Sequence, residues 1–251
     1  VGNEATLGSI SAGQLEAFVR YMRHERSVPC SLKSLARRLT TLRVFFAWLT
    51  EEGIVPTDPA ASLPRQRVTT PLPQPLSDDE GDQLCASTEE WRRDADKPDA
   101  RPHLLVTLLL NTGIKKGECI RMTLADIDTT DPANANVRIR YEGVRQRHKE
   151  RTLRLPVQFP AVLTEYLAQY RPQSELFECS ARNLEYVLDA CTKRAGLPAR
   201  RLSFETLRWT CAVQDFKSGM DEDELRRKLG LSRVSWADTL QKLRELTAPP
   251  L

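Results

Sequence analysis

The 251-residue chain contains no apolar run that approaches the roughly 18 residues needed to span a bilayer. Its mean hydropathy of -0.45 and its 28% of charged residues likewise exclude a membrane protein. The first ten residues, VGNEATLGSI, show neither a basic start nor an apolar stretch before a small-residue cleavage site, so no export signal is visible. We therefore expect a cytoplasmic protein with no membrane partner.

Cysteine is too sparse and too scattered for a cross-linked or metal-bound domain. The six cysteines stand singly, whereas a zinc site would show close pairs and a disulfide scaffold would be denser. We expect reduced, mostly buried thiols, no metal and no cofactor. Internal repeats are absent, and the 37 Lys and Arg against 34 Asp and Glu leave a net charge of only +3. This excess does not by itself identify a nucleic-acid partner.

Two amphipathic helices are predicted near the start of the chain. Apolar residues recur at spacings of three and four between Ser11 and Arg26 and again between Ser31 and Glu52. A cluster of prolines then indicates a linker over residues 67–76. Residues 1–66 are therefore predicted to form a small helical domain.

A capping box formed by Ser77 and Glu80 opens the second predicted domain, residues 77–251. The run from His103 to Gly113 is too apolar for a surface helix, which indicates the buried central helix of this domain. Further helices are predicted at Pro160–Tyr170, Ala181–Ala195, Phe204–Gly219, Asp221–Leu229 and Ser235–Leu246.

Two alternating segments, Asn136–Tyr141 and Arg151–Leu155, predict a β-hairpin, so the fold class is mainly α with a small β element (α+β). Residues 138–154 carry seven Lys or Arg and two Glu. Phosphate contacts by Lys and Arg are the main sequence-independent source of DNA affinity, so the hairpin is suited to DNA. A second basic group lies in the first domain and the linker: Arg37, Arg38, Arg43, Arg65 and Arg67.

Four stretches of the chain, in order, resemble the tyrosine recombinases of the phage integrase family. The second, NTGIKKGECIRMTLADID, is similar to the helix pair that normally contains TGLR. The fourth resembles the box H-x-L-R-H followed by L-G-H-S. The stretches are Thr41–Arg67, Asn111–Asp128, His148–Pro156 and Arg194–Ser232. The resemblance implies a helical, SAM-like core-binding domain followed by a domain of the recombinase catalytic type.

The resemblance also implies a chemistry whose residues can be checked. In the family a tyrosine attacks the scissile phosphate and forms a 3′-phosphotyrosine, while two arginines stabilise the transition state. A lysine protonates the leaving 5′-oxygen, and two further polar residues, usually histidines, position protons and oxygens.

Five of these six positions hold another residue type here. In the order first arginine, lysine, first histidine, second arginine, second histidine and tyrosine, the positions are Lys115, Gln146, Glu205, Arg208, Leu231 and Leu240. A hairpin longer by two residues would move the lysine position to Val144. Only Arg208 matches. A lysine lacks the planar fork of arginine, a carboxylate repels phosphate, and a leucine offers no hydrogen bond.

No neighbouring residue is expected to restore cleavage. All five tyrosines precede the H-x-L-R box. Arg145, Arg147 and Lys149 flank the lysine position, but an arginine is a poor proton donor near neutral pH. Ser235 and Thr239 carry hydroxyls near the tyrosine position without activating partners.

Each of these residues also has a purely structural interpretation. Arg208 either binds phosphate or pairs with Glu205 or Asp215 on its helix. Lys115 and Lys116 either contact phosphate or open a solvated helix. We expect Glu205 to be an ion-pair partner rather than a base, and the leucines at the family positions to pack in the core.

The predicted function is binding of double-stranded DNA without cleavage, in an accessory, regulatory or architectural role. The expected partner besides DNA is an active recombinase, and in a bacterium the protein is expected to associate with the nucleoid. The predicted DNA-binding residues are Arg37, Arg38, Arg43, Arg65, Arg67, Lys115, Lys116, Arg145, Arg147, Lys149 and Arg208. Two alternatives stay open. One is a divergent recombinase with another nucleophile or one supplied in trans, and the other is a protein-interaction module. The C-terminal helix, through Trp236, Leu240, Leu243 and Leu246, is expected to pack either in cis or on a second protomer.

Overall fold

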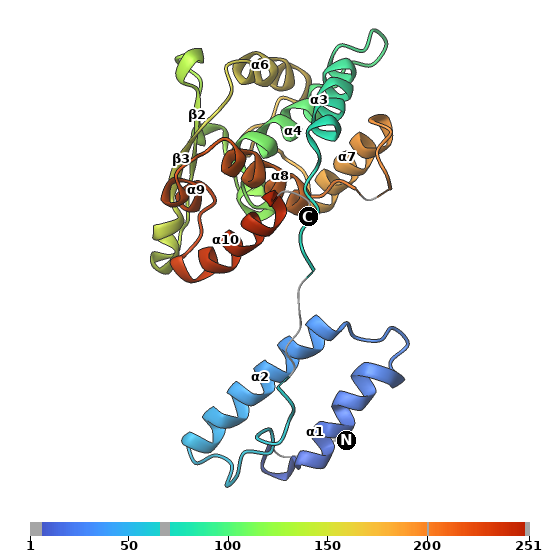
Figure 1. The fold of residues 1–251 in the computed structure, drawn as a ribbon, viewed down its shortest axis with the longest axis vertical. Helices are drawn as coiled ribbons and strands as arrows, with labels where there is room; N and C mark the ends of the chain where they lie inside the picture. Colours follow the sequence, from blue (N-terminus) through green and yellow to red (C-terminus); the bar gives the residue numbers. More distant parts are fainter. Residues whose placement is uncertain (1–6, 66–70, 200, 249–251) are drawn as a thin grey trace. The chain divides into compact units, whose positions relative to one another are not determined.

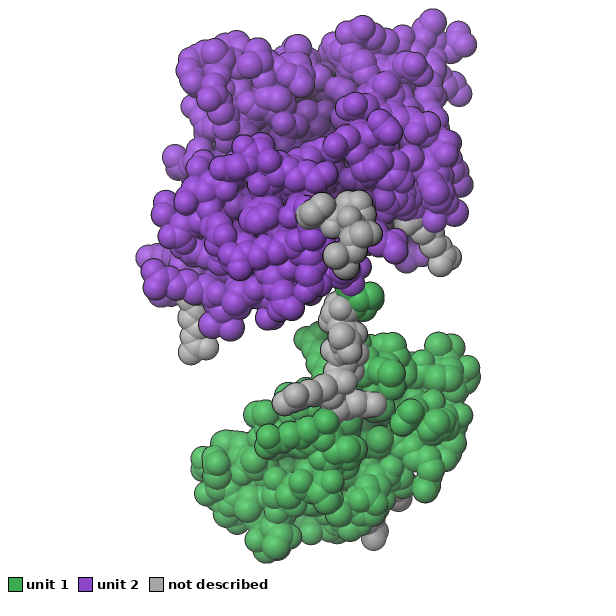
Figure 2. All heavy atoms as spheres, in the orientation of Figure 1, with its two compact units in different colours: residues 1–71 green, residues 72–251 purple. Residues whose placement is uncertain are grey.

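The computed structural model describes residues 7–65, 71–199 and 201–248. The chain divides into two compact units, Val1–Pro71 and Leu72–Leu251 (Figure 2). This division falls within the segment 67–76, for which the sequence predicts a linker. Within the described ranges, no helix combines the length and apolar character needed to cross a membrane.

Unit 1 is a small helical unit built around one long helix. Its elements are η1 (Leu7–Ser9), α1 (Ala12–Arg20), the π-turn η2 (Tyr21–Glu25) and α2 (Leu32–Glu51), shown in Figure 1. Ser11 and Ser31 cap α1 and α2. The single helix predicted from Ser11 to Arg26 is wrong in one detail, because α1 widens into the π-turn after Arg20, where Met22 is buried.

Unit 2 is mainly helical with one small sheet. The capping box of Ser77 and Glu80 forms as predicted. The helices and 3₁₀ turns are α3 (Asp78–Arg92), α4 (Ala100–Thr112), α5 (Lys116–Ile120), η3 (Leu124–Asp126), η4 (Pro132–Asn134), η5 (Val144–Lys149), α6 (Phe159–Tyr170), α7 (Ala181–Arg194), α8 (Phe204–Lys217), α9 (Glu222–Lys228) and α10 (Arg233–Thr247).

Helix α4 forms the centre of unit 2, as its apolar sequence predicts. Ten of its 13 residues are buried. It packs against α3, α6 and α8, which surround it in Figure 1. Its first turn starts at Asp99, whose carboxylate caps the helix, and its last turn ends at Gly113. The position of Gly113 decides where the next helix, α5, begins.

The sheet has the antiparallel order β1–β2–β3. Its strands are β1 (Ile127–Asp128), β2 (Asn136–Ile139) and β3 (Arg151–Arg154). The predicted hairpin of β2 and β3 is confirmed, with Val137 opposite Leu153. The two-residue strand β1 has no alternating pattern of its own, so the sequence did not predict it.

Helices α8, α9 and α10 enclose a separate small core at the end of unit 2. Trp236 and Leu243 of α10 are buried in it, and Leu240 and Leu246 pack at its edge. The apolar face of the last helix therefore packs in cis, on its own chain.

Candidate functional site

Four segments of unit 2 that lie far apart in the sequence meet at one place. They are the start of α5, strand β3, helix α8 and the turn between α9 and α10. Gly113 makes this possible because its φ of +57° ends α4 in the left-handed conformation. A Cβ at Gly113 would lie 3.1 Å from the Sγ of Cys211 and from the Cδ2 of Leu229. Any other residue after α4 would be strained at this φ and would press on both side chains, so the position favours glycine.

Arg208 of α8 holds two of these segments together. Its guanidinium donates hydrogen bonds to the carbonyl of Gly113 and, at 2.6 Å, to the carbonyl of Leu229. The expected partners are engaged elsewhere: Glu205 accepts a hydrogen bond from the Trp209 indole at 2.9 Å, and Asp215 lies 2.6 Å from an α9 lysine. Burial lowers the pKa of Arg208, but an arginine keeps its charge in proteins.

A buried ion pair fixes the hairpin to α5. Both guanidinium Nη atoms of Arg151 donate to the Glu118 carboxylate at 2.9 Å, and the Arg151 Nε donates to the Lys228 carbonyl at 2.6 Å. The side chains of Arg151 and Glu118 are only 7% and 1% exposed. Burial would raise the pKa of Glu118, but Arg151 outweighs it and holds that pKa at about 2. Arg151 therefore faces inward and does not belong to the basic surface of the hairpin.

Gly230 leaves the space that this pair needs. Its φ is +58°, and a Cβ there would lie 2.7 Å from an Nη atom of Arg151. No L-residue with a side chain fits this position without displacing the guanidinium.

Tyr141 is the tyrosine of this network, and its hydroxyl donates to Glu118. Arg121 and Lys149 lie 5.7 and 5.6 Å from the centre of its ring. Burial, followed by the hydrogen bond to Glu118, raises the pKa of Tyr141 to about 12. Its hydroxyl is therefore a firmly protonated donor, which is the opposite of an activated nucleophile.

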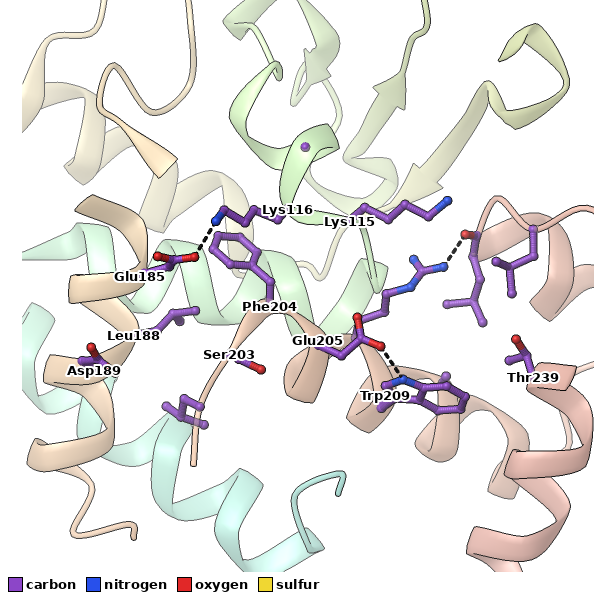
Figure 3. A pocket seen from close by; sticks show the side chains of 16 residues that line it. Lys115, Lys116, Glu185, Leu188, Asp189, Ser203, Phe204, Glu205, Trp209 and Thr239 are labelled. Atoms are coloured by element: carbon purple, nitrogen blue, oxygen red, sulfur yellow. Dashed lines mark hydrogen bonds and ion pairs between the residues drawn. The ribbon is translucent and has the colours of Figure 1, made fainter. Parts of the chain in front are cut away.

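The two lysines at the start of α5 extend in opposite directions (Figure 3). The Lys115 ammonium lies 3.4 Å from the Gly230 carbonyl, whereas Lys116 forms an ion pair with Glu185 of α7. Burial, followed by the charge of Arg208, lowers the pKa of Lys115. The Lys115 side chain thus lies among other cations, whereas Lys116 has a carboxylate partner.

A cavity of about 830 Å³ opens beside these cations between α5, α7, α8 and α10 (Figure 3). Glu205, Trp209 and Thr239 line it, as does Leu231. Leu240 lies half-buried against the small core of α8, α9 and α10. Leu231 and Leu240 pack against this core, but they are half-buried at its edge rather than inside it as the sequence predicted. Neither side chain can bind a phosphate oxygen.

The hairpin turn η5 presents its polar side chains to solvent. Gln146 and Arg147 are exposed, Lys149 is half-buried, and the side chain of Arg145 lies outside the described part of the chain. Nearby, Arg140 pairs with Asp126 at 2.6 Å. The freely available basic surface of the hairpin is therefore smaller than its seven basic residues suggest.

The predicted basic residues of unit 1 divide in a similar way. Arg37, Arg38 and Arg65 are exposed. Arg43 is half-buried and donates to the Leu63 carbonyl, so it fastens the segment after α2 onto that helix. Arg67 lies outside the described residues.

The described ranges contain no group of three His, Cys, Asp or Glu that could hold a metal ion. The six cysteines are free thiols, and Cys119, Cys191 and Cys211 are buried. The polar groups that meet between α5, the hairpin and α8 are cations, one buried carboxylate and a phenol.

Unit 2 therefore combines a helical α+β fold with a cluster of cations between α5, the hairpin and α8. A family model described as "Phage integrase family" matches residues 74–239. This match covers most of the chain, which belongs to that family, the tyrosine recombinases.

Curated relatives agree with this assignment. The tyrosine recombinase XerC of Mycobacterium tuberculosis is 33% identical over 114 residues, which are 45% of this chain and 37% of the relative. XerC of Pelotomaculum thermopropionicum is 26% identical over 236 residues, covering 87% of this chain and 73% of the relative. The match to the mycobacterial protein thus spans little more than a third of that relative's length.

Solved structures share the fold. The XerH site-specific recombinase bound to a palindromic difH substrate matches with a TM-score of 0.71 at 17% identity, over 96% of this chain and 70% of that one. A lambda integrase dimer bound to a COC′ core site matches with a TM-score of 0.69 at 16% identity, over 100% and 69%. At this identity the similarity establishes the fold, and the predicted α+β class is confirmed.

Proposed function

We propose that this chain binds double-stranded DNA without cleaving it, as an accessory, regulatory or architectural relative of the active recombinases. The observation that carries the proposal is a group of cations, Lys115, Lys149 and Arg208, that form no ion pair with a carboxylate in the described part of the chain. They lie at a site that lacks the groups for cleavage. That XerC proteins are recombinases and that XerH and lambda integrase were solved on DNA supports DNA as the ligand.

The charges around Lys115 favour an anionic ligand. The charged side chains that act most strongly on Lys115 include three cations and one anion. The cations are Arg208, Lys149 and Arg151, and the anion is Glu118. Glu118 is already held by Arg151. In the described part of the chain, Lys115, Lys149 and Arg208 form no ion pair with a carboxylate, and a phosphate would supply the missing negative charge.

Cleavage chemistry lacks its components at the same place. Lys115 keeps a positive charge but not the planar fork that grips two phosphate oxygens. The Gln146 amide is not acidic enough to protonate a leaving oxygen, and the Glu205 carboxylate repels phosphate. The side chain of Leu240 cannot attack phosphorus, and the nearby phenol of Tyr141 is held protonated by Glu118.

Two rival functions make different predictions. A recombinase that takes its tyrosine from a partner chain would form a covalent complex with DNA. A protein-interaction module would bind no duplex even at low salt. The proposed function predicts salt-sensitive binding and no covalent complex.

Replacing the hairpin cations tests the DNA contact. We expect the Arg147→Ala/Lys149→Ala variant to bind duplex DNA more weakly than the parent chain. The slope of log K against log salt should fall by up to about 0.9 for each phosphate that the variant no longer binds. Fluorescence anisotropy of a labelled duplex, titrated at several salt concentrations, measures both quantities.

A matched control removes the same charge elsewhere in unit 2. Lys97→Ala/Lys193→Ala deletes two exposed lysines from the α3–α4 connection and from α7. We expect this control to retain the affinity and salt slope of the parent. If the parent and the hairpin variant bind equally at every salt concentration, the hairpin does not contact DNA.

A further inference from the structure

Tyr141, which follows strand β2, has two cations from different segments on its ring. The guanidinium carbon of Arg121 lies 5.7 Å from the ring centre, and the ammonium of Lys149 lies 5.6 Å from it. At both distances a cation is attracted to an aromatic face. Arg121 caps the end of α5 and Lys149 ends η5, so the ring brings together positive charges that lie far apart in the sequence.

The protein fixes the position of this ring. The Tyr141 hydroxyl donates to Glu118, whose carboxylate is bonded to both Nη atoms of Arg151. The Tyr141 backbone N–H donates to Glu150 at 3.1 Å. Arg151 also donates to the Lys149 carbonyl at 2.9 Å, so the segment that carries the second cation is fixed by the same ion pair.

The charge of Arg121 is available to a ligand. Its side chain is exposed, and in the described part of the chain neither Arg121 nor Lys149 forms an ion pair with a carboxylate. A Cβ at Gly117 would lie 3.3 Å from an Nη atom of Arg121, so the guanidinium lies beside a residue that lines the cavity. Two cations close to one ring repel each other, and an anion bound to both would offset that repulsion.

Another arginine–tyrosine pair of unit 2 lacks this arrangement. Arg182 of α7 lies 5.4 Å from the ring centre of Tyr186 and donates to its hydroxyl at 2.9 Å. A carboxylate, Glu185, acts on Arg182 as a nearby negative charge. Among the described residues, only the Tyr141 ring has two cations on it.

We propose that Arg121 binds a phosphate of duplex DNA beside Lys149, and that Tyr141 is a positioning residue that holds both cations for this contact. The inference rests on the proposed function, because it takes DNA as the anion. A phosphate can accept from two cations at once, whereas a base edge has no charge to offset theirs. Arg121 belongs to neither basic group of the sequence, so no motif singles it out.

Salt-dependent binding of a labelled duplex by the full chain tests the Arg121 contact. Arg121→Ala should weaken binding about three- to tenfold at low salt and lower the slope of log K against log salt by up to about 0.9. The loss should be the same on two duplexes of unrelated sequence, because a phosphate contact carries no sequence information. Arg182→Ala, which removes the arginine from the other tyrosine ring, should bind like the parent.

Two substitutions of Tyr141 test the role of its ring. Tyr141→Phe and Tyr141→Leu both lose the hydrogen bond to Glu118, but only Tyr141→Leu loses the ring. We expect Tyr141→Phe to keep most of the parent's affinity and Tyr141→Leu to bind about as weakly as Arg121→Ala. The combined variant Arg121→Ala/Tyr141→Leu should lose less affinity than the two single losses added together, because both act on one contact. Circular dichroism verifies that each variant is folded.

The titration distinguishes a failure of this contact from a failure of DNA binding itself. If the parent chain binds no duplex, the proposed function is wrong, and this inference with it. If the parent binds and Arg121→Ala matches it in affinity and salt slope, only the Arg121 contact is wrong. A loss confined to one of the two duplexes would overturn the phosphate contact in favour of a base contact. If Tyr141→Phe binds as weakly as Tyr141→Leu, the ring does not position the cations.

Discussion

The cluster in unit 2 has an inner and an outer layer that differ in how completely their polar groups are bonded. The inner layer comprises Glu118, Tyr141, Arg151 and Arg208. The outer layer comprises Lys115, Gln146, Glu205, Leu231 and Leu240. Every inner side chain donates to or accepts from a neighbour within the protein. The outer positions border the cavity or solvent, and under the proposed function they no longer supply the chemistry of cleavage.

The difference separates what holds the fold from what performs the reaction. The inner groups join α5, the hairpin, α8 and the α9–α10 turn, so a change there exposes or unpairs a buried charge. The outer groups make weaker connections: the Lys115 ammonium reaches the Gly230 carbonyl at 3.4 Å, and the hydrogen bond of Glu205 stays within α8. The fold is therefore expected to tolerate their replacement more readily. Under the proposed function, the recombinase fold therefore persists without its cleavage residues.

The largest expected effect is on stability, at the inner layer. Glu118→Ala leaves the buried Arg151 guanidinium without its partner and should lower the free energy of unfolding by about 3–5 kcal/mol. Gln146→Ala, at an exposed outer position, should change it by less than about 0.5 kcal/mol. Urea denaturation measures both values, and similar decreases in the two variants would erase the distinction between the layers.

Low pH should weaken the Glu118–Arg151 ion pair. Glu118 has a pKa of about 2 in the folded protein against an ordinary value of 4.5. Its contribution is complete above pH 4.5 and is lost as the pH falls toward 2, a change of about 3 kcal/mol. The stability advantage of the parent over Glu118→Gln should shrink across this window. Denaturant titration of both proteins over a pH series measures this advantage. If it stays constant from pH 6 to the lowest measurable pH, Glu118 is not the ionised partner of Arg151.

Arg208 should behave as an inner residue although it occupies a family site position. Arg208→Met removes the two hydrogen bonds to backbone carbonyls and should cost about 1.5–3 kcal/mol of stability. Thermal unfolding of this variant, compared with Glu205→Gln, provides the measurement. If Arg208→Met unfolds at the same temperature as the parent but loses DNA binding, Arg208 binds phosphate and does not stabilise the fold.

Much of the fold follows from local sequence patterns. The capping residues, the buried helix after Asp99 and the alternating strands of the hairpin each lie within a short stretch of chain, and the structure confirms them. The short strand β1 and the π-turn after α1 have no comparable local pattern.

The inner layer could not be predicted in this way. Arg151 meets Glu118 across 33 residues and the Lys228 carbonyl across 77. From the sequence Arg151 counted as one more cation of a basic hairpin. The replaced positions were visible because the family motif gives each an expected residue type, whereas no motif indicates that Arg208 binds two carbonyls.

A suicide-substrate assay tests most directly whether the site is unable to cleave DNA. The parent chain and Leu240→Tyr are incubated with a nicked duplex that traps phosphotyrosine, beside an active tyrosine recombinase on its own substrate, and resolved under denaturing conditions. We predict binding by the parent and no covalent band from either protein, because a new tyrosine would still lack the arginine fork and the acid. A denaturant-resistant complex formed by the parent would contradict the proposed function.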